Sequence, residues 1–470
     1  RNIIIMFGIL TGLFCSLNFL MPKTASAKQI SSKLKNGVFT VSGDGDMLSY
    51  AAPKAAQKKK IKKIVVKKGV TSIPEDAFKD CSKASNITIA STVRVIGARA
   101  FFNTGVKKIT IPKTTESIGQ AVLQNCKKLQ EVTMPGHFNS IGVKKNKENL
   151  VCTLLLGEGN SNIVNKVKFS TDFNADGLTD IGDCKNFEVL STDSKYKSID
   201  GCIYTKDGKT LVAIPYGKSE VKIAEGCEEV RVSSYSYASY RYVNSKAVYR
   251  GYNGCGQLRK ITFPSTFKTL STDDNISVYA GKRQQKYTDI QIELNTNYID
   301  EDCVKLFWNS KQLWRKSLAA ELERIGCVTI KDNMVILEDG GLCGYIGESE
   351  NVEITIPNNV KYICENAFNS LSDATVQNFS IKSIVLNDNI EEIPVGAFCG
   401  NKNIKVYAKN NLRIWNYAFK NCGNYEDLAF DFPVQIAKNK KNAMLTLKGK
   451  PNENLKNAEI GTVTITLGGD

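Results

Sequence analysis

The chain has 470 residues, which is too long for one ordinary hydrophobic core, so it must form several domains or an array of repeats that grows in one direction. Its 42% of hydrophobic and 23% of charged residues are typical of a folded chain and exclude a disordered tail or a multi-span membrane protein. The formal net charge is +16, so the surface is strongly basic.

Residues 1–27 predict a secretory signal peptide. They contain Arg1, an apolar stretch from Ile3 to Met21, and the small-residue triplet Ala25-Ser26-Ala27 at the cleavage position. The alternative is an uncleaved membrane anchor, because the apolar stretch is nearly long enough to span a bilayer. We therefore expect a secreted or cell-surface protein that contacts a membrane only if this segment is retained.

Removal of the signal peptide leaves a net charge of +14, since it takes away two basic residues and no acidic one. The anions available outside a cell are wall polymers, acidic glycans and lipid headgroups. No nucleic-acid-binding motif accompanies the charge, so we expect no nucleic-acid partner. We expect an extracellular protein or glycan as the partner, with an anionic wall polymer as one form of it.

A repeated pattern follows the N-terminal cap segment, which we assign to residues 28–58, and occupies residues 59–145. Its strand-like segments begin at Ile64, Ile87, Ile109 and Val132, and a second set of residues keeps the same steps: Ile73, Ile96, Ile118 and Ile141. Apolar residues alternate with period two in each segment, which predicts a short strand with one buried face. Because no unit can cover its own apolar face, the units must stack.

Four cysteines occupy one point of the repeating unit: Cys81, Cys126, Cys399 and Cys422. Fourteen cysteines in a secreted chain could form disulfides. A small side chain that recurs at one position of a stacked unit, however, is typical of core packing. We therefore expect mostly free, buried thiols.

The pattern weakens after residue 145 and then returns. We assign residues 146–270 to degenerate repeats with a hairpin and a tyrosine-rich insertion, and residues 271–340 to a non-repeat brace with one amphipathic helix over Val304–Ile325. Within these parts, residues 146–195 and 271–340 do not keep the repeat. Residues 341–436 form a second repeat block, and residues 437–470 form a C-terminal cap or the edge of a further domain.

These residues resemble the BspA-like leucine-rich-repeat proteins of bacterial surfaces, whose repeat runs I-x-I-P-x-x-V-x-x-I-x-x-x-A-F-x-x-C-x-x-L. Three further segments resemble the family: Val38–Tyr50 as its opening segment, and Tyr196–Pro215 and Asp339–Pro357 as hairpins that introduce a new run of repeats. The resemblance implies an α/β-type leucine-rich-repeat solenoid, with one short parallel strand per repeat and mostly turns and short helical segments on the other side. It also implies a role in adhesion.

Strand residues that are not buried would face a ligand. On the predicted strands these positions are often basic: Lys62, Lys63, Lys107, Lys108, Arg259, Lys260 and Lys382. Basic units alternate with neutral or mixed ones, which eases repulsion between them and leaves a positive strip. We hypothesise an anion-binding face for a wall polymer or acidic glycan, and the alternative is an ordinary solvated surface.

A second candidate surface lies in the tyrosine-rich stretch from Arg231 to Tyr252. Its aromatic and basic residues offer wide, rigid contacts of the kind that recognition surfaces use: Tyr235, Tyr237, Tyr240, Arg241, Tyr242, Tyr249, Arg250 and Tyr252. The alternation of residues also suits a plain exposed strand.

The segment from Asp172 to Asp183 matches the spacing of a calcium loop. Oxygen ligands stand at positions one, three, five, nine and twelve, with Gly177 at position six: Asp172, Asn174, Asp176, Asp180 and Asp183. A degenerate repeat is the alternative. We expect no other cofactor.

Catalytic motifs are missing from the sequence. The chain has one histidine, His137, which follows a Pro-Gly turn without a nucleophile motif, and there is no glycine-rich phosphate loop. We therefore expect no enzyme but a secreted or cell-surface binding module. The alternative is a noncatalytic targeting arm of a larger wall- or polysaccharide-active protein.

Overall fold

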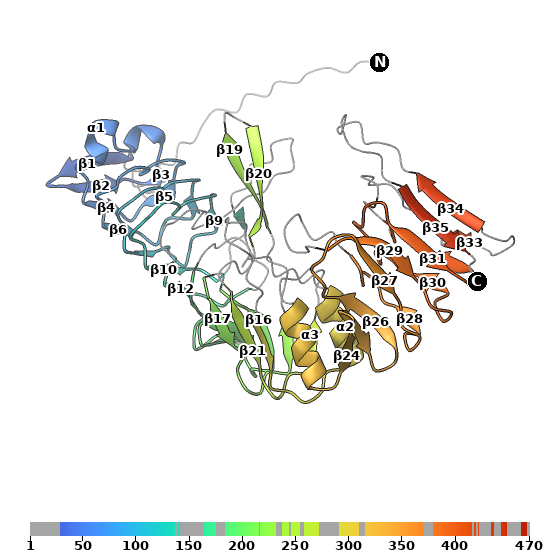
Figure 1. Cartoon of the computed structure of the whole chain (residues 1–470). Coiled ribbons are helices and arrows are strands. Elements are labelled where there is room, and N and C mark those ends of the chain that lie inside the picture. The colour runs from blue at the N-terminus through green and yellow to red at the C-terminus, as the bar shows by residue number, and fades with distance from the viewer. Residues whose placement is uncertain are drawn as a thin grey trace, which may run out of the picture.

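The computed structural model describes residues 29–136, 140–141, 164–174, 184–215, 217–231, 237–243, 246–253, 258–271, 291–309, 315–369, 379–415, 418–419, 422, 434–436, 443–448 and 462–467. These residues form many short strands and few helices. Figure 1 shows the strands following an arc, from β1 and β2 at one end through β17 and β21 to β31 and β35 at the other. The predicted signal peptide and His137 lie outside the described residues.

A first ladder of parallel strands runs through the N-terminal part. Ile64 pairs with Ile87 and Ile109 pairs with Val132, so the predicted strand positions do lie on stacked parallel strands. The strands form two consecutive sheets. The first contains β2 (Val38–Ser42), β4 (Lys63–Val66) and β6 (Asn86–Ile89), and the second contains β8 (Lys108–Thr110), β10 (Glu131–Met134), β12 (Lys166–Phe169) and β13 (Phe187–Glu188). Strand β1 (Ser31–Lys35) covers the outer edge of β2 in antiparallel orientation.

The inner isoleucines form a second parallel ladder. Ile73 pairs with Ile96, Ile96 with Ile118, and Ile118 with Ile141. The strands are β3 (Gly45–Asp46), β5 (Val70–Ile73), β7 (Val95–Ile96), β9 (Ser117–Ile118) and β11 (Ser140–Ile141). The short helices η1 (Ser49–Ala51) and α1 (Ala55–Lys58) lie between β3 and β4 in the chain. Both repeating sets of residues therefore lie on paired strands. The expectation of one strand per repeat is wrong, because the inner isoleucines form a second ladder where turns and short helical segments were expected.

The Ala-Phe pair of each repeat fills the interior with stacked aromatic rings. The rings of Phe78 and Phe101 lie 5.6 Å apart with an interplanar angle of 6°, and the rings of Phe368, Phe398 and Phe419 continue this arrangement at 5.4 and 5.5 Å in the C-terminal part. Each phenylalanine is fully buried. Stacking of equivalent residues thus makes each repeat depend on its neighbours.

The repeated cysteines cap backbone carbonyls of the preceding repeat. The thiol of Cys126 donates to the carbonyl of Phe101 at 3.2 Å, and the thiol of Cys422 donates to the carbonyl of Phe398 at 3.1 Å. No disulfide links the cysteines that the structure describes, and all of these but Cys364 are buried. Burial also raises the pKa of Cys81 to about 11. The expectation of buried thiols is confirmed for the described residues.

Three antiparallel hairpins each open a run of parallel ladders. Two adjacent residues with positive φ form the tip of each first turn, as a type I′ turn requires: Asn36-Gly37, Asp200-Gly201 and Asp332-Asn333. The second hairpin region comprises β14 (Tyr196–Ile199), β15 (Cys202–Thr205) and β16 (Thr210–Ala213), and the third comprises β24 (Val328–Lys331), β25 (Met334–Leu337) and β26 (Gly341–Tyr345). The prediction for Tyr196–Pro215 is confirmed. The prediction for Asp339–Pro357 starts too late, because the antiparallel strands run from Val328 to Tyr345 and only β26 lies within the predicted segment.

The second and third hairpins separate three hydrophobic cores, and their inner strands are buried on both faces. Met334 and Ile336 belong to the C-terminal core, whereas the alternate residues Val335 and Leu337 belong to the middle core. Strand β16 is likewise buried along its whole length. A sheet that contacts a core on each side needs apolar residues at consecutive positions, so its sequence loses the alternation that marks the ordinary repeat strands.

The middle and C-terminal runs repeat the two-ladder arrangement. In the middle run, β17 (Glu220–Lys222), β21 (Lys260–Phe263) and β23 (Gln291–Leu294) form the first ladder, and β18 (Glu229–Arg231) and β22 (Thr269–Ser271) extend the second from β16. In the C-terminal run, the first ladder has β27 (Val352–Thr355), β29 (Ile381–Val385), β31 (Lys405–Ala408) and β35 (Thr462–Leu467), and the second has β28 (Tyr362–Ile363), β30 (Glu392–Ile393) and β32 (Leu412–Ile414).

The C-terminal segment adds strands to both ladders. The strand-like TVTITL segment is β35, which pairs in parallel with β31, and β34 (Ala443–Lys448) pairs with β35 in antiparallel orientation. Strand β33 (Val434–Ile436) pairs in antiparallel orientation with β32. Antiparallel strands therefore cover the edges of both ladders here, as β1 does at the other end.

Three strands continue the ladders where the sequence has no repeat. Strands β12 and β13 extend the N-terminal ladder within residues 146–195, and β23 extends the middle ladder within residues 271–340. The inference that these residues leave the repeat is wrong for the strands. A strand needs only alternate buried residues, such as Val167 and Phe169 on β12, and these do not depend on the rest of the consensus.

Two short helices, rather than one long helix, form the brace. Helix α2 covers Glu301–Asn309 and helix α3 covers Arg315–Arg324, and residues 310–314 lie outside the described residues. Helix α2 packs beside β22 and β26, whereas α3 packs beside β23 and β24. The two helices thus contact different strands.

No helix among the described residues is long and apolar enough to cross a membrane.

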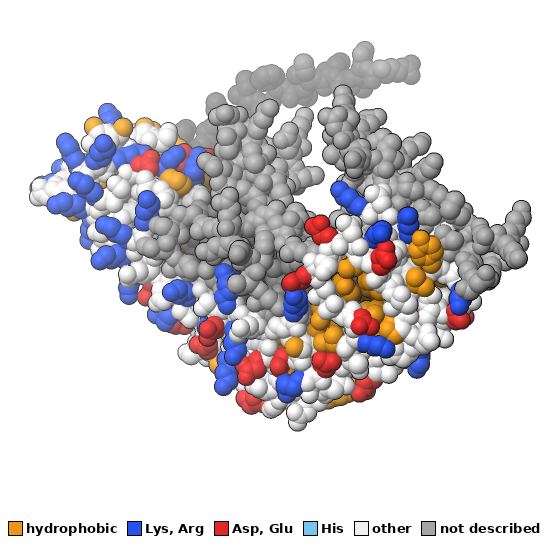
Figure 2. Space-filling model, viewed as in Figure 1, with side chains coloured by type: hydrophobic (Ala, Val, Ile, Leu, Met, Phe, Trp, Pro, Cys, Tyr) orange, Lys and Arg blue, Asp and Glu red, His pale blue; other side chains and the backbone are white. Residues whose placement is uncertain are grey.

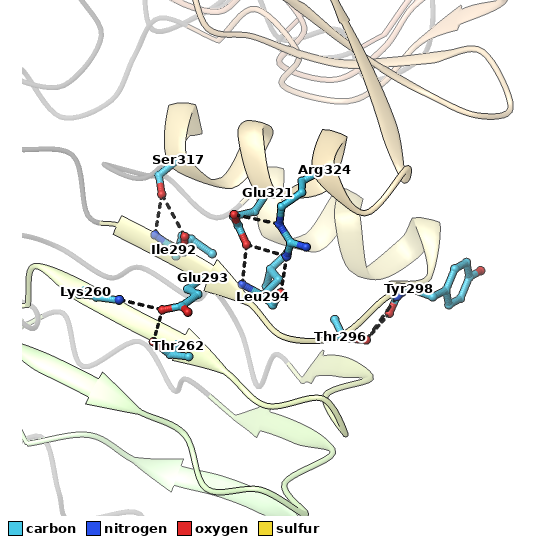
Figure 3. Close-up of polar contacts among 10 residues, drawn as sticks. All are labelled: Lys260, Thr262, Ile292, Glu293, Leu294, Thr296, Tyr298, Ser317, Glu321 and Arg324. Carbon is cyan, nitrogen blue, oxygen red and sulfur yellow. Dashed lines mark hydrogen bonds and ion pairs between the residues drawn. The ribbon is translucent and has the colours of Figure 1, made fainter.

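Helix α3 covers the edge of β23 with polar side chains instead of another strand. Ser317 accepts a hydrogen bond from the N–H of Ile292, and Glu321 accepts one from the N–H of Leu294 at 2.8 Å (Figure 3). Arg324 donates to the carbonyl of Leu294 and pairs with Glu321 at 2.9 Å. The helix therefore satisfies backbone groups that a further parallel strand would otherwise satisfy.

The stack of phenylalanine rings predicts a large loss of stability when one ring is removed. In a Phe398→Ala variant, the free energy of unfolding should fall by about 3–5 kcal/mol, because removal of the ring leaves a cavity between Phe368 and Phe419. Thermal unfolding followed by circular dichroism measures this. A Tyr407→Ala control, whose ring is 39% exposed, should change little, and equal losses in both variants would contradict the stacking argument.

The cap of β23 should weaken in acid. Burial of the Glu321 carboxyl opposes its ionisation, but hydrogen bonds from Arg324 and Leu294 outweigh burial and lower the pKa of Glu321. The stabilisation is therefore complete above the pKa of the unfolded carboxyl, about 4.3, and is lost as the pH falls through the lower folded-state value. A Glu321→Gln variant should be less stable by about 1 kcal/mol at neutral pH, and this difference should vanish in acid. A difference independent of pH, or an equal one in a Glu338→Gln control, would contradict this.

Candidate ligand-binding surface

The outward side chains of the N-terminal ladder form rows in which basic and acidic residues alternate, rather than a basic strip. In one row, Lys108 lies opposite Glu131, and Glu131 lies opposite Lys166 on the next strand. The carboxylate of Glu131 is 3.2 Å from the Lys108 ammonium and 3.7 Å from that of Lys168. Glu131 offsets part of the charge of these lysines, and Glu188 lies 2.6 Å from Lys166 and 3.4 Å from Lys168.

Two further predicted ligand residues are paired in the same way. Lys260 lies 2.7 Å from Glu293, and Lys382 lies 2.8 Å from Glu353 on the neighbouring strand. Each glutamate raises the pKa of its lysine by accepting a hydrogen bond. The exposed side chain of Arg259 donates to the carbonyl of Leu258. Instead of one continuous basic strip, Lys260 and Lys382 thus form separate ion pairs across neighbouring strands.

Three predicted lysines remain without a carboxylate partner among the described residues, and they are Lys62, Lys63 and Lys107. Lys62 and Lys63 belong to a dense run of seven lysines, at positions 58, 59, 60, 62, 63, 67 and 68. Most of this run is exposed, and the backbone N–H groups of Lys62 and Lys63 both bond to the carbonyl of Gly37, which holds the run against the opening hairpin. The run precedes β4 and continues beyond it.

The acidic residues near this run are occupied by other partners. Arg99 lies 2.6 Å from Glu75 and 2.8 Å from Asp76, and its hydrogen bond lowers the pKa of Asp76. Asp46 accepts a hydrogen bond from Thr71. Residues 29–90 contain twelve lysines against five acidic residues, and Figure 2 shows basic side chains covering this end of the molecule. We define the basic end as the run from Lys58 to Lys68.

The structure therefore shifts the candidate surface toward the end of the ladder. Sequence reasoning selected Lys62 and Lys63 as strand positions but omitted Lys59, Lys60 and Lys68, because they flank the strand. A count of charge along the chain would have found them, since the run is visible in the sequence.

The tyrosine-rich segment forms a separate antiparallel hairpin of strands β19 (Tyr237–Val243) and β20 (Lys246–Asn253). Tyr240 pairs with Tyr249, and the two strands join no other described strand (Figure 1). The proposed contacts of Tyr235, Tyr237, Tyr240, Arg241, Tyr242, Tyr249, Arg250 and Tyr252 rest on side chains outside the described residues. A recognition role for this hairpin stays a prediction.

Most of the predicted calcium loop also lies outside the described residues. Only Asp172 and Asn174 are described, and both are exposed, whereas Asp176, Asp180 and Asp183 are not described. The backbone of Asp172 packs closely on Gly136, where an added Cβ would lie 2.1 Å from the Asp172 carbonyl oxygen. Among the described residues no group of three or more histidine, cysteine, aspartate or glutamate side chains could hold a metal ion. Calcium binding stays a prediction.

A family model describing the BspA-type leucine-rich-repeat region matches the chain in six copies, at residues 52–172 and 347–444. These two segments consist of BspA-type leucine-rich repeats. The two matched segments cover most of both predicted repeat blocks and leave the middle run between them. No curated protein matches this chain.

Solved structures of bacterial leucine-rich-repeat proteins are similar to this protein at low sequence identity. A leucine-rich-repeat protein from Eubacterium ventriosum is 19% identical, with 85% of this chain and 88% of that one covered and a TM-score of 0.33. The pneumococcal vaccine antigen PcpA is 14% identical, with 81% and 85% covered and a TM-score of 0.30. A leucine-rich-repeat protein from Bacteroides ovatus is 14% identical, with 84% and 96% covered and a TM-score of 0.26.

The pairing of Glu131 predicts how the ladder surface of this protein responds to a lost carboxylate. A Glu131→Gln variant leaves Lys108 and Lys168 without this partner, so it should elute from a phosphate-bearing cation exchanger at higher salt than a Glu350→Gln variant. The control removes the same charge from an exposed site without an ion pair among the described residues. Elution of both variants at the same salt concentration would contradict the prediction.

Proposed function

We propose that this chain is a secreted or cell-surface solenoid without catalytic activity, and that its basic end binds an anionic polymer outside the cell. The observation that carries the proposal is the dense charge of the run from Lys58 to Lys68, none of whose lysines forms an ion pair with a carboxylate among the described residues, while Glu75 and Asp76 pair with Arg99. The predicted signal peptide supports an extracellular location, and the adhesion implied by the family resemblance supports a binding role.

A polyanion suits this surface better than a single small anion. Five of the seven lysines of the run are exposed, and Lys58 and Lys63 are half-buried, so the positive charges lie along an open surface. Several lysines can contact successive negative groups of one chain and release the counterions that surround it, which gives affinity without a shaped pocket. Such binding depends strongly on salt, because exposed charges are screened over about 8 Å at physiological ionic strength.

The experiment compares two variants with the same net charge. In the first, Lys59, Lys60, Lys62 and Lys68 are replaced with glutamine at the basic end. In the second, four exposed lysines of the C-terminal run are replaced with glutamine: Lys361, Lys402, Lys405 and Lys409. Binding of the full chain to poly(glycerol phosphate), a model wall polymer, is measured by calorimetry at several salt concentrations.

We expect the first variant to lose about tenfold or more in affinity and to show a weaker dependence on salt. The second variant should bind like the unmodified chain. Equal losses in both variants would show that only net charge matters and would contradict a defined surface. Affinity that does not change with salt would contradict the electrostatic proposal itself.

A further inference from the structure

A cavity of about 480 Å³ lies between the brace and the second ladder of the C-terminal run, far along the chain from the basic end. This volume is in the range of about 300–1,000 Å³ that small-molecule sites occupy. Its lining comes from α2, β26, β28, β30 and the segments that follow β28, β30 and β32. Figure 2 shows hydrophobic side chains gathered over this part of the molecule, with charged side chains around them.

Two glycines of β26 make room for aromatic walls of the cavity. A Cβ at position 344 would lie 1.8 Å from the Trp308 ring, and one at position 341 would lie 2.6 Å from the Tyr362 ring. Both rings therefore pack directly on the strand backbone. The hydroxyl of Tyr362 donates to the carboxylate of Asp339, which fixes the orientation of this ring.

Trp415 supplies a third aromatic wall and is held by polar contacts. Its indole N–H donates to the Glu392 carboxylate at 3.0 Å, and the Arg413 guanidinium lies 5.9 Å from the ring centroid. The side chain is half-buried, so part of it remains open to a ligand. A half-buried tryptophan that is held in place by side chains of two strands forms a preorganised contact surface.

The polar groups at the cavity are mainly hydrogen-bond acceptors. Glu365 and Glu392 line it and are exposed, and Glu365 has no hydrogen bond or ion pair among the described residues. Lys305 is the one basic residue of the lining, and it lies within 4.0 Å of Glu301 and 3.9 Å of Asp302. Residues 341–415 contain six basic and eight acidic residues, so this part of the chain lacks the positive excess of the basic end.

We propose that this cavity binds a neutral sugar ring of an extracellular glycan. One face of a pyranose ring carries C–H groups whose hydrogens are slightly positive, and this face packs on the negative face of an aromatic ring. Its hydroxyl groups are hydrogen-bond donors that match the Glu365 and Glu392 carboxylates, and the Lys305 ammonium can donate to a sugar oxygen. The apolar floor of Ile363, Pro394 and Val395 excludes water from the ring.

Tryptophan fluorescence provides a direct test, because two of the three tryptophans in the chain line the cavity. The full chain is titrated with neutral oligosaccharides of glucose, galactose, mannose and N-acetylglucosamine. We expect a saturable change in emission with at least one of them. A Trp415→Ala variant should weaken that binding at least tenfold, and a Glu365→Ala variant, altered at an exposed position, should weaken it several-fold.

The controls separate this site from the basic end. A Tyr407→Ala variant removes an exposed aromatic ring from the other ladder, and the variant altered at Lys59, Lys60, Lys62 and Lys68 removes polyanion binding; both should bind the sugar like the unmodified chain. The proposal is overturned if none of the neutral oligosaccharides binds, if only charged glycans or basic peptides bind, or if Glu365→Ala binds unchanged. The Glu365 variant decides the matter if Trp415→Ala fails to fold.

Discussion

The structure depends on one constraint: a repeat strand cannot bury its apolar face or satisfy its backbone without a strand beside it. Ile64 and Ile87 pair across neighbouring strands, and the rings of Phe368, Phe398 and Phe419 stack in the interior for the same reason. Each ladder edge therefore needs a cover. Antiparallel β1 and β34 supply it near the two ends of the arc, and helix α3 supplies it beside β23.

The parts of the fold that the sequence predicted are those in which one residue type serves one role in every repeat. The step between Ile64 and Ile87 correctly predicted the first ladder, and the equal step between Ile73 and Ile96 correctly gave the repeat length but was not assigned to a second strand. Strands β12, β13 and β23 were missed because two buried residues are enough for a strand, and so short a pattern is not distinctive. The third hairpin was misplaced because burial of Met334 and Val335 on opposite faces removes the alternation.

The functional surfaces were harder to predict because they depend on contacts between repeats. Lys108 and Lys260 look like free cations in the sequence, but the stacking places Glu131 and Glu293 beside them. The lining of the cavity comes from a helix and three separate strands, and no local motif connects Trp308 with Trp415. Core positions are fixed by stacking, whereas outward positions are free to vary. This freedom allows a basic end and a C-terminal run of nearly balanced charge on one scaffold.

Native-state hydrogen exchange read by mass spectrometry tests most directly whether stacking continues through the degenerate part of the chain. The amides of residues 166–169 on β12 and 291–294 on β23 should exchange as slowly as those of residues 131–134 on β10, since all three strands belong to parallel ladders. Exchange of the β12 and β23 amides at the rate of exposed loops, with β10 still protected, would contradict the account.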